Sequence, residues 1–483
     1  MNIINLLIEN EDAEASAGAT FDRLNPITGD VASRAAAATI ADARRAADAA
    51  AAAFPAWSAT GPAARRTILL KAADILASRA PEFIALMAAE TGATAAWAGF
   101  NVHLASGMLR EAAAMTTQIA GEVIPSDKPG CISMAVRQPA GVVLSIAPWN
   151  APVILGARAV ALPLACGNTV ILKASEICPG THRLIGECLR DAGLPPGVMN
   201  VITNAPDDAP ALIEALIAHP AVRRINFTGS TRVGRLIAQT AATHLKPVLL
   251  ELGGKAPLVV LEDADLDAAV AASAFGAFMN QGQICMSTER LVVDRTVAEA
   301  FVSKLAVKAE QLVAGDPRQG NAPLGSLIDA SAADRMQALI KDAVGKGARV
   351  VAGGRVEGTL MSATVLDHVT SSMRIYGEES FGPIVTVVRV DGVDEAVRVA
   401  NDTEYGLSAA VFGRDIARAL TVAKRIESGI CHVNGATVHD EAQMPFGGTK
   451  SSGYGRFGGR AGIAEFTELR WITIETGPQA YPI

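Results

Sequence analysis

The feature that most constrains the fold is a repeated alternation of short apolar runs with helical patterns in the middle of the chain. The apolar runs lie at 170–172, 199–202, 224–227 and 248–251, and helical patterns occupy 181–192, 208–218 and 232–242 between them. Strand–helix–strand repetition with continuously apolar strands is typical of a parallel sheet covered on both faces. The alternation restarts after Lys255. The sequence therefore predicts two α/β lobes in series that divide near residue 253.

The segments before this region have a different character. An Ala-rich stretch at 34–54 carries interleaved charges and predicts an amphipathic helix, and longer helical patterns follow at 63–91 and 94–120. Residues 133–147 are rich in Val, Ile and Leu with turn signals at Pro139 and Gly141, which predicts strands.

Composition limits the function classes. The 483 residues carry a formal net charge of −7, which argues against nucleic acid or an anionic membrane as the main partner. Residues 1–8 are too short for a signal peptide and lack a basic start, and no apolar run is long enough to span a membrane. The six cysteines form no Cys-x-x-Cys pair, which favours free thiols in the cytoplasm and no metal site.

Cys285 stands in the polar sequence Asn280-Gln-Gly-Gln-Ile-Cys-Met-Ser-Thr, unlike Cys166 and Cys188 in apolar surroundings. An arbitrary Cys is more often inert packing than a nucleophile. A nucleophilic thiol also needs donors for the alkoxide that forms on attack at a carbonyl. The Asn150 amide, after a strand end, can provide one donor and the Cys285 N–H a second. The alternative for Asn150 is a local turn before Pro152.

Glu251 follows an apolar strand and precedes two glycines. Parallel α/β sheets place their ligands at this carboxyl edge. Partial burial would raise the pKa of Glu251 and make it a usable general base. The alternative is a salt bridge to Lys255.

Two further strand ends predict a dinucleotide site. In Phe227-Thr-Gly-Ser-Thr, Gly229 and Ser230 open a helix whose N–H groups can hold a pyrophosphate. Lys173 and Glu176 follow the strand at 170–172 and can bond the adenosine ribose. A carboxylate at the 2′ position repels a 2′-phosphate, which favours NAD over NADP.

In combination, these motifs resemble the aldehyde dehydrogenase superfamily over essentially the whole chain. The matching stretches are Pro148-Trp-Asn150, Gly167 to Glu176, Phe227 to Gly234, Glu251 to Lys255, Gly282-Gln-Ile-Cys285, Glu378 to Pro383, Asn401 to Leu407 and Pro445-Phe-Gly-Gly448. The resemblance implies a Rossmann-like NAD-binding domain (1–120 and 140–253), an α/β catalytic domain (254–451) and a β oligomerisation extension (121–139 and 467–476) that builds homodimers or homotetramers.

The resemblance also implies a mechanism and further site residues. Cys285 adds to the aldehyde, hydride passes to NAD, and Glu251 activates the water that hydrolyses the thioester. The residues assigned to the cofactor are Ile146, Trp149, Lys173, Glu176, Gly229, Ser230, Leu252, Glu379 and Phe381. One departure is Phe457, where many relatives carry a Glu with a proposed proton-relay role, so the exit route for the proton of Glu251 is left open.

Two features bear on the substrate. The sequence around Cys285 resembles that of bacterial vanillin and salicylaldehyde dehydrogenases, and Arg158 lies eight residues after Asn150 on the helix expected to line the substrate tunnel. We expect Arg158 to donate to an oxygen substituent on the ring of an aromatic aldehyde. The alternative is an internal ion pair with Asp440. The expected apolar walls are Trp97, Ile154, Met286 and Phe446.

Three alternatives stay open. An Arg also suits succinic semialdehyde, so a dehydrogenase for that or another aliphatic aldehyde is the second reading. A CoA-acylating enzyme would lack a water-activating Glu251, and a silent NAD-binding protein would be expected to lose Cys285, Asn150 or Glu251.

Overall fold

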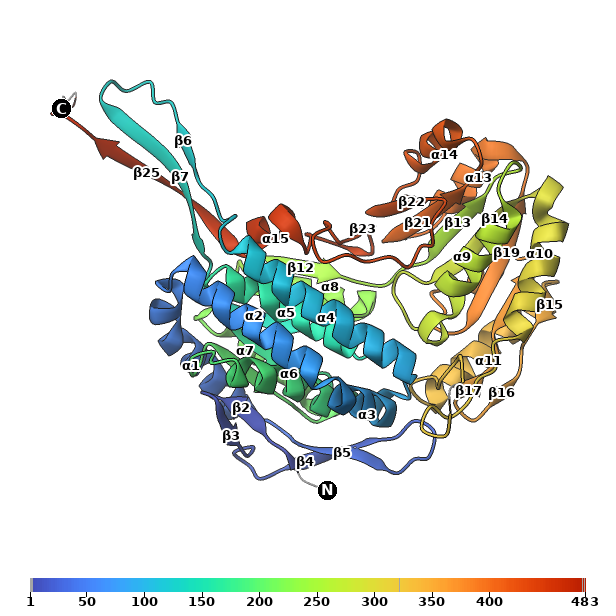
Figure 1. Ribbon diagram of the computed structural model, residues 1–483, viewed down its shortest axis with the longest axis horizontal. Coiled ribbons are helices and arrows are strands. Elements are labelled where there is room, and N and C mark those ends of the chain that lie inside the picture. Colours follow the sequence, from blue (N-terminus) through green and yellow to red (C-terminus); the bar gives the residue numbers. More distant parts are fainter. Residues whose placement is uncertain (1–2, 321, 480, 482) are drawn as a thin grey trace.

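Each of the two α/β lobes is built on one sheet, and a three-stranded ribbon projects from the first lobe (Figure 1). The computed structural model describes residues 3–320, 322–479, 481 and 483. Residues 1 and 2 of the expected NAD-binding range and residue 321 of the expected catalytic range lie outside the described residues. The domain boundaries drawn from the sequence stay predictions.

The first sheet has five parallel central strands, so their carboxyl ends meet at one edge. Its order is β24 (Gly453–Tyr454), β12 (Val248–Glu251), β11 (Val222–Thr228), β8 (Val142–Ile146), β9 (Thr169–Lys173), β10 (Met199–Ile202), β2 (Leu6–Ile8) and β3 (Glu11–Ala13). Strand side chains alternate between faces. Val170 and Leu172 of β9 therefore join one core while Ile171 joins the other.

Helices cover both faces of this sheet (Figure 1). One face carries α2 (Pro62–Ser78), α3 (Ala80–Thr91), α4 (Ala95–Met115), α5 (Pro152–Ala165) and α6 (Pro179–Asp191). The other carries α1 (Ile40–Ser58), α7 (Ala209–Ala218) and α8 (Thr231–Thr243). Every residue of α5 is buried, because this helix lies between the sheet and α4.

The second sheet is parallel except for its first strand. Its order is β15 (Arg349–Ala352), β18 (Thr364–Asp367), β19 (Ile384–Val390), β14 (Thr288–Asp294), β13 (Ala256–Val260), β21 (Ser408–Phe412) and β22 (Ile430–Val433). The covering helices are α9 (Leu266–Phe278) and α10 (Arg295–Glu310) on one face, with α11 (Ala330–Gly345), α13 (Gly392–Asn401) and α14 (Ile416–Ala423) on the other.

The ribbon is antiparallel and runs away from both lobes (Figure 1). It contains β6 (Glu122–Ile124), β7 (Cys131–Pro139) and β25 (Thr467–Glu475). The strand signal at 133–147 is thus divided between two sheets, since β7 belongs to the ribbon and β8 to the first lobe. The chain changes direction at Gly141, whose φ of +134° favours glycine.

The N-terminal expectations need correction. The Ala-rich helix begins at Ile40 and not at 34, because residues 31–36 form β5 (Val31–Ala36) between β1 (Ile3–Ile4) and β4 (Thr20–Leu24). Thr39 starts the helix by a capping box with Asp42. The pattern at 63–91 is two helices that meet at Arg79.

Short elements complete the chain. They are β16 (Val356–Glu357), β17 (Leu360–Met361), β20 (Tyr405–Gly406), β23 (Thr449–Lys450), α12 (Arg374–Gly377), α15 (Gly459–Glu465) and the 3-10 turns η1 (Pro206–Asp208) and η2 (Met279–Gly282). Within the described ranges, no helix combines the length and apolar character needed to cross a membrane.

Candidate active site

The three predicted catalytic residues come from different elements that meet where the two sheets face each other. Asn150 follows β8, Glu251 ends β12, and Cys285 lies in the turn between η2 and β14. The Asn150 amide donates to the Gln283 carbonyl oxygen at 3.0 Å. A Cβ on Gly254 would stand 2.3 Å from the Cys285 carbonyl oxygen, so only glycine allows this close approach. The turn that carries Cys285 is therefore bound to the ends of β8 and β12.

The local-turn alternative for Asn150 is not what the structure shows. Its amide reaches across to the Cys285 turn, and its carbonyl oxygen accepts from the Trp97 indole and the Asn280 amide, both at 3.0 Å. One amide proton of Asn150 is left for another acceptor. The Cys285 backbone N–H also has no partner among the described residues. Two donors without a partner among the described residues are thus available at the turn that carries the thiol.

The turn itself is held in a strained conformation. Asn280 and Gln281 have φ values of +48° and +54°, which are rare for residues with a side chain. The Gln283 side chain accepts from the Ile328 N–H at 3.0 Å and donates to the Ser326 carbonyl oxygen at 3.2 Å. These bonds fix the backbone on which the thiol sits.

Glu251 is buried, and neither carboxylate oxygen has a partner among the described residues. Burial raises the pKa of Glu251 well above its ordinary value of 4.5, against the opposing charges of Arg158 and Arg456. The alternative of a Glu251–Lys255 salt bridge is wrong, because Lys255 pairs with Glu289 at 2.6 Å. Glu251 is therefore a protonatable group with no structural partner.

The Cys285 thiol belongs to the same electrostatic environment. Burial, with the negative charges of Glu251 and Glu379, raises the pKa of Cys285 to about 12. A pKa raised in this way favours the protonated thiol over the thiolate. Formation of the thiolate then depends on a nearby base or on added positive charge.

A satisfied polar network lies behind the thiol. Glu289 accepts from the Ser380 N–H at 2.9 Å, from the Ser380 hydroxyl at 2.8 Å and from the Phe381 N–H at 3.0 Å, besides its pair with Lys255. These bonds hold Phe381 at a φ of +51°. The Phe381 ring meets Trp149 edge-on, with centroids 5.7 Å apart.

Glu379, next in this segment, accepts from the Gly254 N–H at 2.8 Å. Burial raises the pKa of Glu379 to about 7. Its carboxylate therefore lies beside the two glycines that follow Leu252.

The strand ends of the first sheet bring the other predicted cofactor residues together. Lys173 forms an ion pair with Glu176, which also accepts from the Asn204 amide at 3.1 Å. Burial opposes ionisation of Glu176, but Lys173 and the hydrogen bonds to the carboxylate together outweigh it, and the pKa of Glu176 is lowered. Ser230 caps α8 by accepting from the Val233 N–H.

The N–H groups of Thr231 and Arg232 have no protein partner within the described residues, so this helix end can accept an anion. Ile146, Gly229 and Leu252 lie at the ends of the same parallel strands, and the Gly229 N–H donates to the Glu251 carbonyl oxygen at 2.9 Å. This edge of the sheet therefore fits a dinucleotide.

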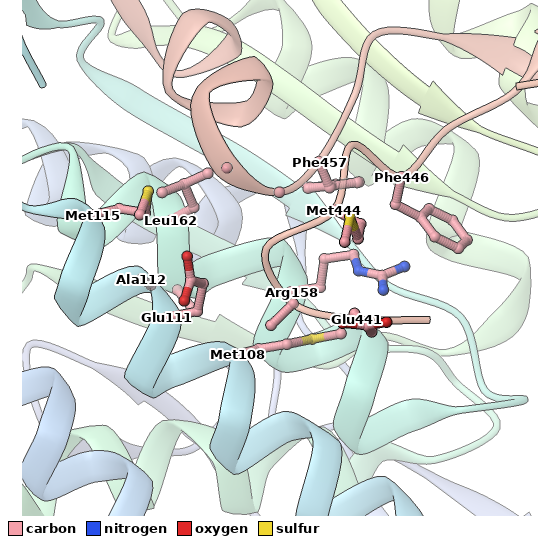
Figure 2. Close-up of a pocket in the computed structure, with 14 residues that line it drawn as sticks. Met108, Glu111, Ala112, Met115, Arg158, Leu162, Glu441, Met444, Phe446 and Phe457 are labelled. Carbon is pink, nitrogen blue, oxygen red and sulfur yellow. The ribbon is translucent and has the colours of Figure 1, made fainter. Parts of the chain in front are cut away.

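A pocket opens between α4, α5 and the segment 441–459 (Figure 2), and it is lined by Arg158, whose charge acts on Glu251 and Cys285. Of the five expected substrate residues, Arg158 and Phe446 line it. Trp97, Ile154 and Met286 are buried in the apolar cluster against which Cys285 also packs. Their substrate roles stay predictions.

Arg158 forms the ion pair with Asp440 that the sequence raised as an alternative, and both side chains are more than nine-tenths buried. The guanidinium also lies 4.1 Å from the centroid of the Phe446 ring. Phe457 is buried beside them and pairs with Phe446 through the backbone. An apolar ring thus occupies the position where many relatives carry Glu.

Sequence reasoning missed the α4 side of the pocket and the Lys255–Glu289 pair. Met108, Glu111, Ala112 and Met115 line the pocket at helical spacings of three and four residues, which was the available signal (Figure 2). Glu289 stands four residues after Cys285, but nothing local indicates that it would reach Ser380.

Comparison with known proteins identifies the family. The aldehyde dehydrogenase family model matches residues 13–472. The chain belongs to the aldehyde dehydrogenase family. It is therefore an enzyme that oxidises aldehydes, and the fold and family expected from the sequence are confirmed.

Individual relatives of this aldehyde dehydrogenase cover almost its whole length. A vanillin dehydrogenase of Pseudomonas fluorescens is 64% identical over 478 residues, covering 99% of both chains. A salicylaldehyde dehydrogenase of Pseudomonas putida is 56% identical with the same coverage. A crystal structure of a salicylaldehyde dehydrogenase from Pseudomonas putida G7 with salicylaldehyde superposes with a TM-score of 0.98 at 55% identity, covering 100% of both chains.

Proposed function

We propose that this aldehyde dehydrogenase oxidises substituted aromatic aldehydes of the salicylaldehyde and vanillin type to carboxylic acids, with NAD and water. The observation that carries the proposal is the pocket between α4 and α5, in which the Phe446 ring and the Arg158 guanidinium form one wall. An aromatic ring packs well on such a wall, and its oxygen substituents find polar partners there. The vanillin and salicylaldehyde dehydrogenases that resemble the chain support the same substrate class.

The proposed mechanism uses the three converging residues. The Cys285 thiol first loses its proton to solvent. The thiolate then adds to the aldehyde carbon, and the remaining Asn150 amide proton and the Cys285 N–H stabilise the alkoxide. NAD, when bound, supplies the acceptor for the hydride that leaves this carbon. Glu251 then takes a proton from water, which attacks the thioester and releases the acid together with the Cys285 thiolate.

Preference for NAD rests on Glu176. The lowered pKa keeps this carboxylate charged at the end of β9, where it would repel the 2′-phosphate of NADP. The other proposed cofactor contacts are Ile146, Trp149, Lys173, Gly229, Ser230, Leu252, Glu379 and Phe381. The test is the ratio of kcat/KM for NAD over NADP, which should exceed 1 and should fall in Glu176→Gln.

The substrate proposal is tested by a steady-state panel with salicylaldehyde, vanillin, benzaldehyde and succinic semialdehyde. The expected result is NADH and free acid without CoA, with kcat/KM for the aromatic aldehydes well above that for succinic semialdehyde. A higher value for succinic semialdehyde would favour the aliphatic alternative. A requirement for CoA would contradict the role of Glu251.

The ribbon is proposed to build a homodimer or homotetramer. Val123, Leu469 and Trp471 on its strands are 74%, 60% and 76% exposed, which is unusual for large apolar side chains. A second copy of this chain would cover them. Light scattering is expected to give two or four times the 49.8 kDa chain mass.

We also propose that the enzyme is cytoplasmic, supported by six free cysteines.

A further inference from the structure

In the Arg158–Asp440 pair, one of the two Asp440 carboxylate oxygens has no hydrogen-bond donor among the described residues. The Asp440 Oδ2 atom holds the Arg158 guanidinium, while Oδ1 is buried without a hydrogen-bond partner among the described residues. A buried carboxylate oxygen with no donor is unfavourable, since it has lost water and gained nothing. The Asp440 Oδ1 atom therefore needs a hydrogen bond from a donor outside the described protein groups.

The Arg158 side of the pair lies at the pocket proposed for the substrate. Arg158 lines the pocket, its guanidinium lies on the Phe446 ring, and the charges of Arg158 and Asp440 both act on the Cys285 thiol. A ring stacked in this pocket would bring its substituents to Arg158 and, through it, to Asp440. Figure 2 shows Arg158 beside Phe446 on the side of the pocket opposite α4.

We propose that Asp440 selects substrates with a hydroxyl on the aromatic ring, by accepting the hydroxyl hydrogen at Oδ1. The inference rests on the proposed function and assigns the specificity within that site. Arg158 has further N–H groups besides the one that holds Asp440. The two side chains then form two hydrogen bonds with a substrate hydroxyl. The hydroxyl oxygen accepts from Arg158, and the hydroxyl donates to Asp440.

This arrangement separates a hydroxyl from a methoxy group. Both oxygens can accept from Arg158, but only the hydroxyl can donate to Asp440. The decisive quantity is therefore the ratio of kcat/KM for a hydroxybenzaldehyde over the matching methoxybenzaldehyde, measured at the 2, 3 and 4 positions. We expect the ratio to be at least about tenfold at one position, as for a hydrogen bond to a charged group.

The test is Asp440→Asn, which keeps the shape of the side chain. If its amide oxygen still faces Arg158, its NH₂ group turns towards the substrate as a donor. The hydroxy/methoxy ratio should then fall by about tenfold or more, while benzaldehyde is still oxidised. The steric difference between the two substrates is the same in both proteins and does not affect the comparison. An unchanged ratio would overturn the proposal.

Two further variants keep the result interpretable. Arg158→Lys retains Asp440 and should keep a hydroxy preference, whereas a preference made by Arg158 alone would disappear. Asp367→Asn alters another Arg–Asp pair, which joins β18 to Arg389 of β19 in the second sheet, and should leave the ratio unchanged even if stability drops. If the wild type oxidised no aromatic aldehyde, the proposed function itself would fail; if it oxidised benzaldehyde with a ratio near 1, only the role of Asp440 would fail.

Discussion

Two buried groups of charges flank Cys285, and they differ in one respect. On the framework side, Lys255 and Glu289 are 0% and 4% exposed and form a network that includes both oxygens of Glu289. On the pocket side, Glu251 has no partner, and one oxygen of Asp440 has none either, among the described residues. The side chains of both groups are more than nine-tenths buried, so burial alone does not distinguish them.

This difference in hydrogen bonding indicates that Lys255 and Glu289 have a structural role and that Glu251 and Asp440 have a role in the reaction. In the Lys255–Glu289 pair, both Glu289 oxygens accept hydrogen bonds from framework groups, namely Lys255, Ser380 and Phe381. Glu251 and Asp440 keep acceptors that only substrate or water can use. Unsatisfied buried groups of this kind cluster at functional sites.

The largest effect should come from removing the thiol between the two groups. Cys285→Ser should lower aldehyde oxidation by about 10⁴-fold or more, because the hydroxyl is a far weaker nucleophile here. The melting temperature should stay close to that of the wild type, since the framework network is untouched. Cys431→Ser, at a thiol on β22, is the matched control and should keep full activity. Substantial NADH formation by Cys285→Ser would contradict the assignment.

Breaking the framework pair should chiefly affect stability. Lys255→Met leaves the buried Glu289 carboxylate without its counter-charge and should cost about 3–5 kcal/mol in the free energy of unfolding. Urea denaturation measures this directly. The control is Lys304→Met in the exposed pair with Asp267, where about 1 kcal/mol or less is expected. A similarly small loss in Lys255→Met would remove the distinction between the two groups.

The smallest effect is a pH dependence to which Glu251, on the pocket side, contributes. Because the folded protein holds the Glu251 proton more tightly than the unfolded chain, stability falls as pH rises from 4.5 towards the raised pKa. Thioester hydrolysis should rise over the same range, by up to about tenfold per pH unit. Melting curves of Glu251→Gln should lack this part of the stability loss. Parallel pH profiles of wild type and Glu251→Gln would show that Glu251 does not titrate as described.

The residues at the strand ends were predicted well from the sequence. Parallel strands bring their carboxyl ends to one edge of the sheet, even when the motifs are far apart in the chain. Glu251, Lys173 and Ser230 each follow an apolar run, so their shared edge could be predicted without contacts. The boundary at 34–40 was wrong because Ala-rich sequence has no side-chain signal for strand pairing. The break at Arg79 did have a local signal, since Pro81 stands in the first turn of α3. Tertiary pairing with β4 made residues 31–36 a strand.

The sequence could not determine which residues form ion pairs with each other in the site. Lys255 lies four residues from Glu251, and local spacing gave no reason to prefer Glu289. The Arg158–Asp440 pair joins residues 282 positions apart. Such contacts depend on how the two lobes and the segment 441–459 pack, which motifs do not encode.

The most direct test of the central claim is intact-protein mass spectrometry of Glu251→Gln after mixing with NAD and benzaldehyde. If Cys285 forms the thioester and Glu251 hydrolyses it, one equivalent of NADH should appear, and the protein should keep the mass of one benzoyl group on Cys285. Wild type should return to the unmodified mass within its turnover time. Continued turnover of Glu251→Gln at the wild-type rate, with no acylated Cys285, would contradict the account.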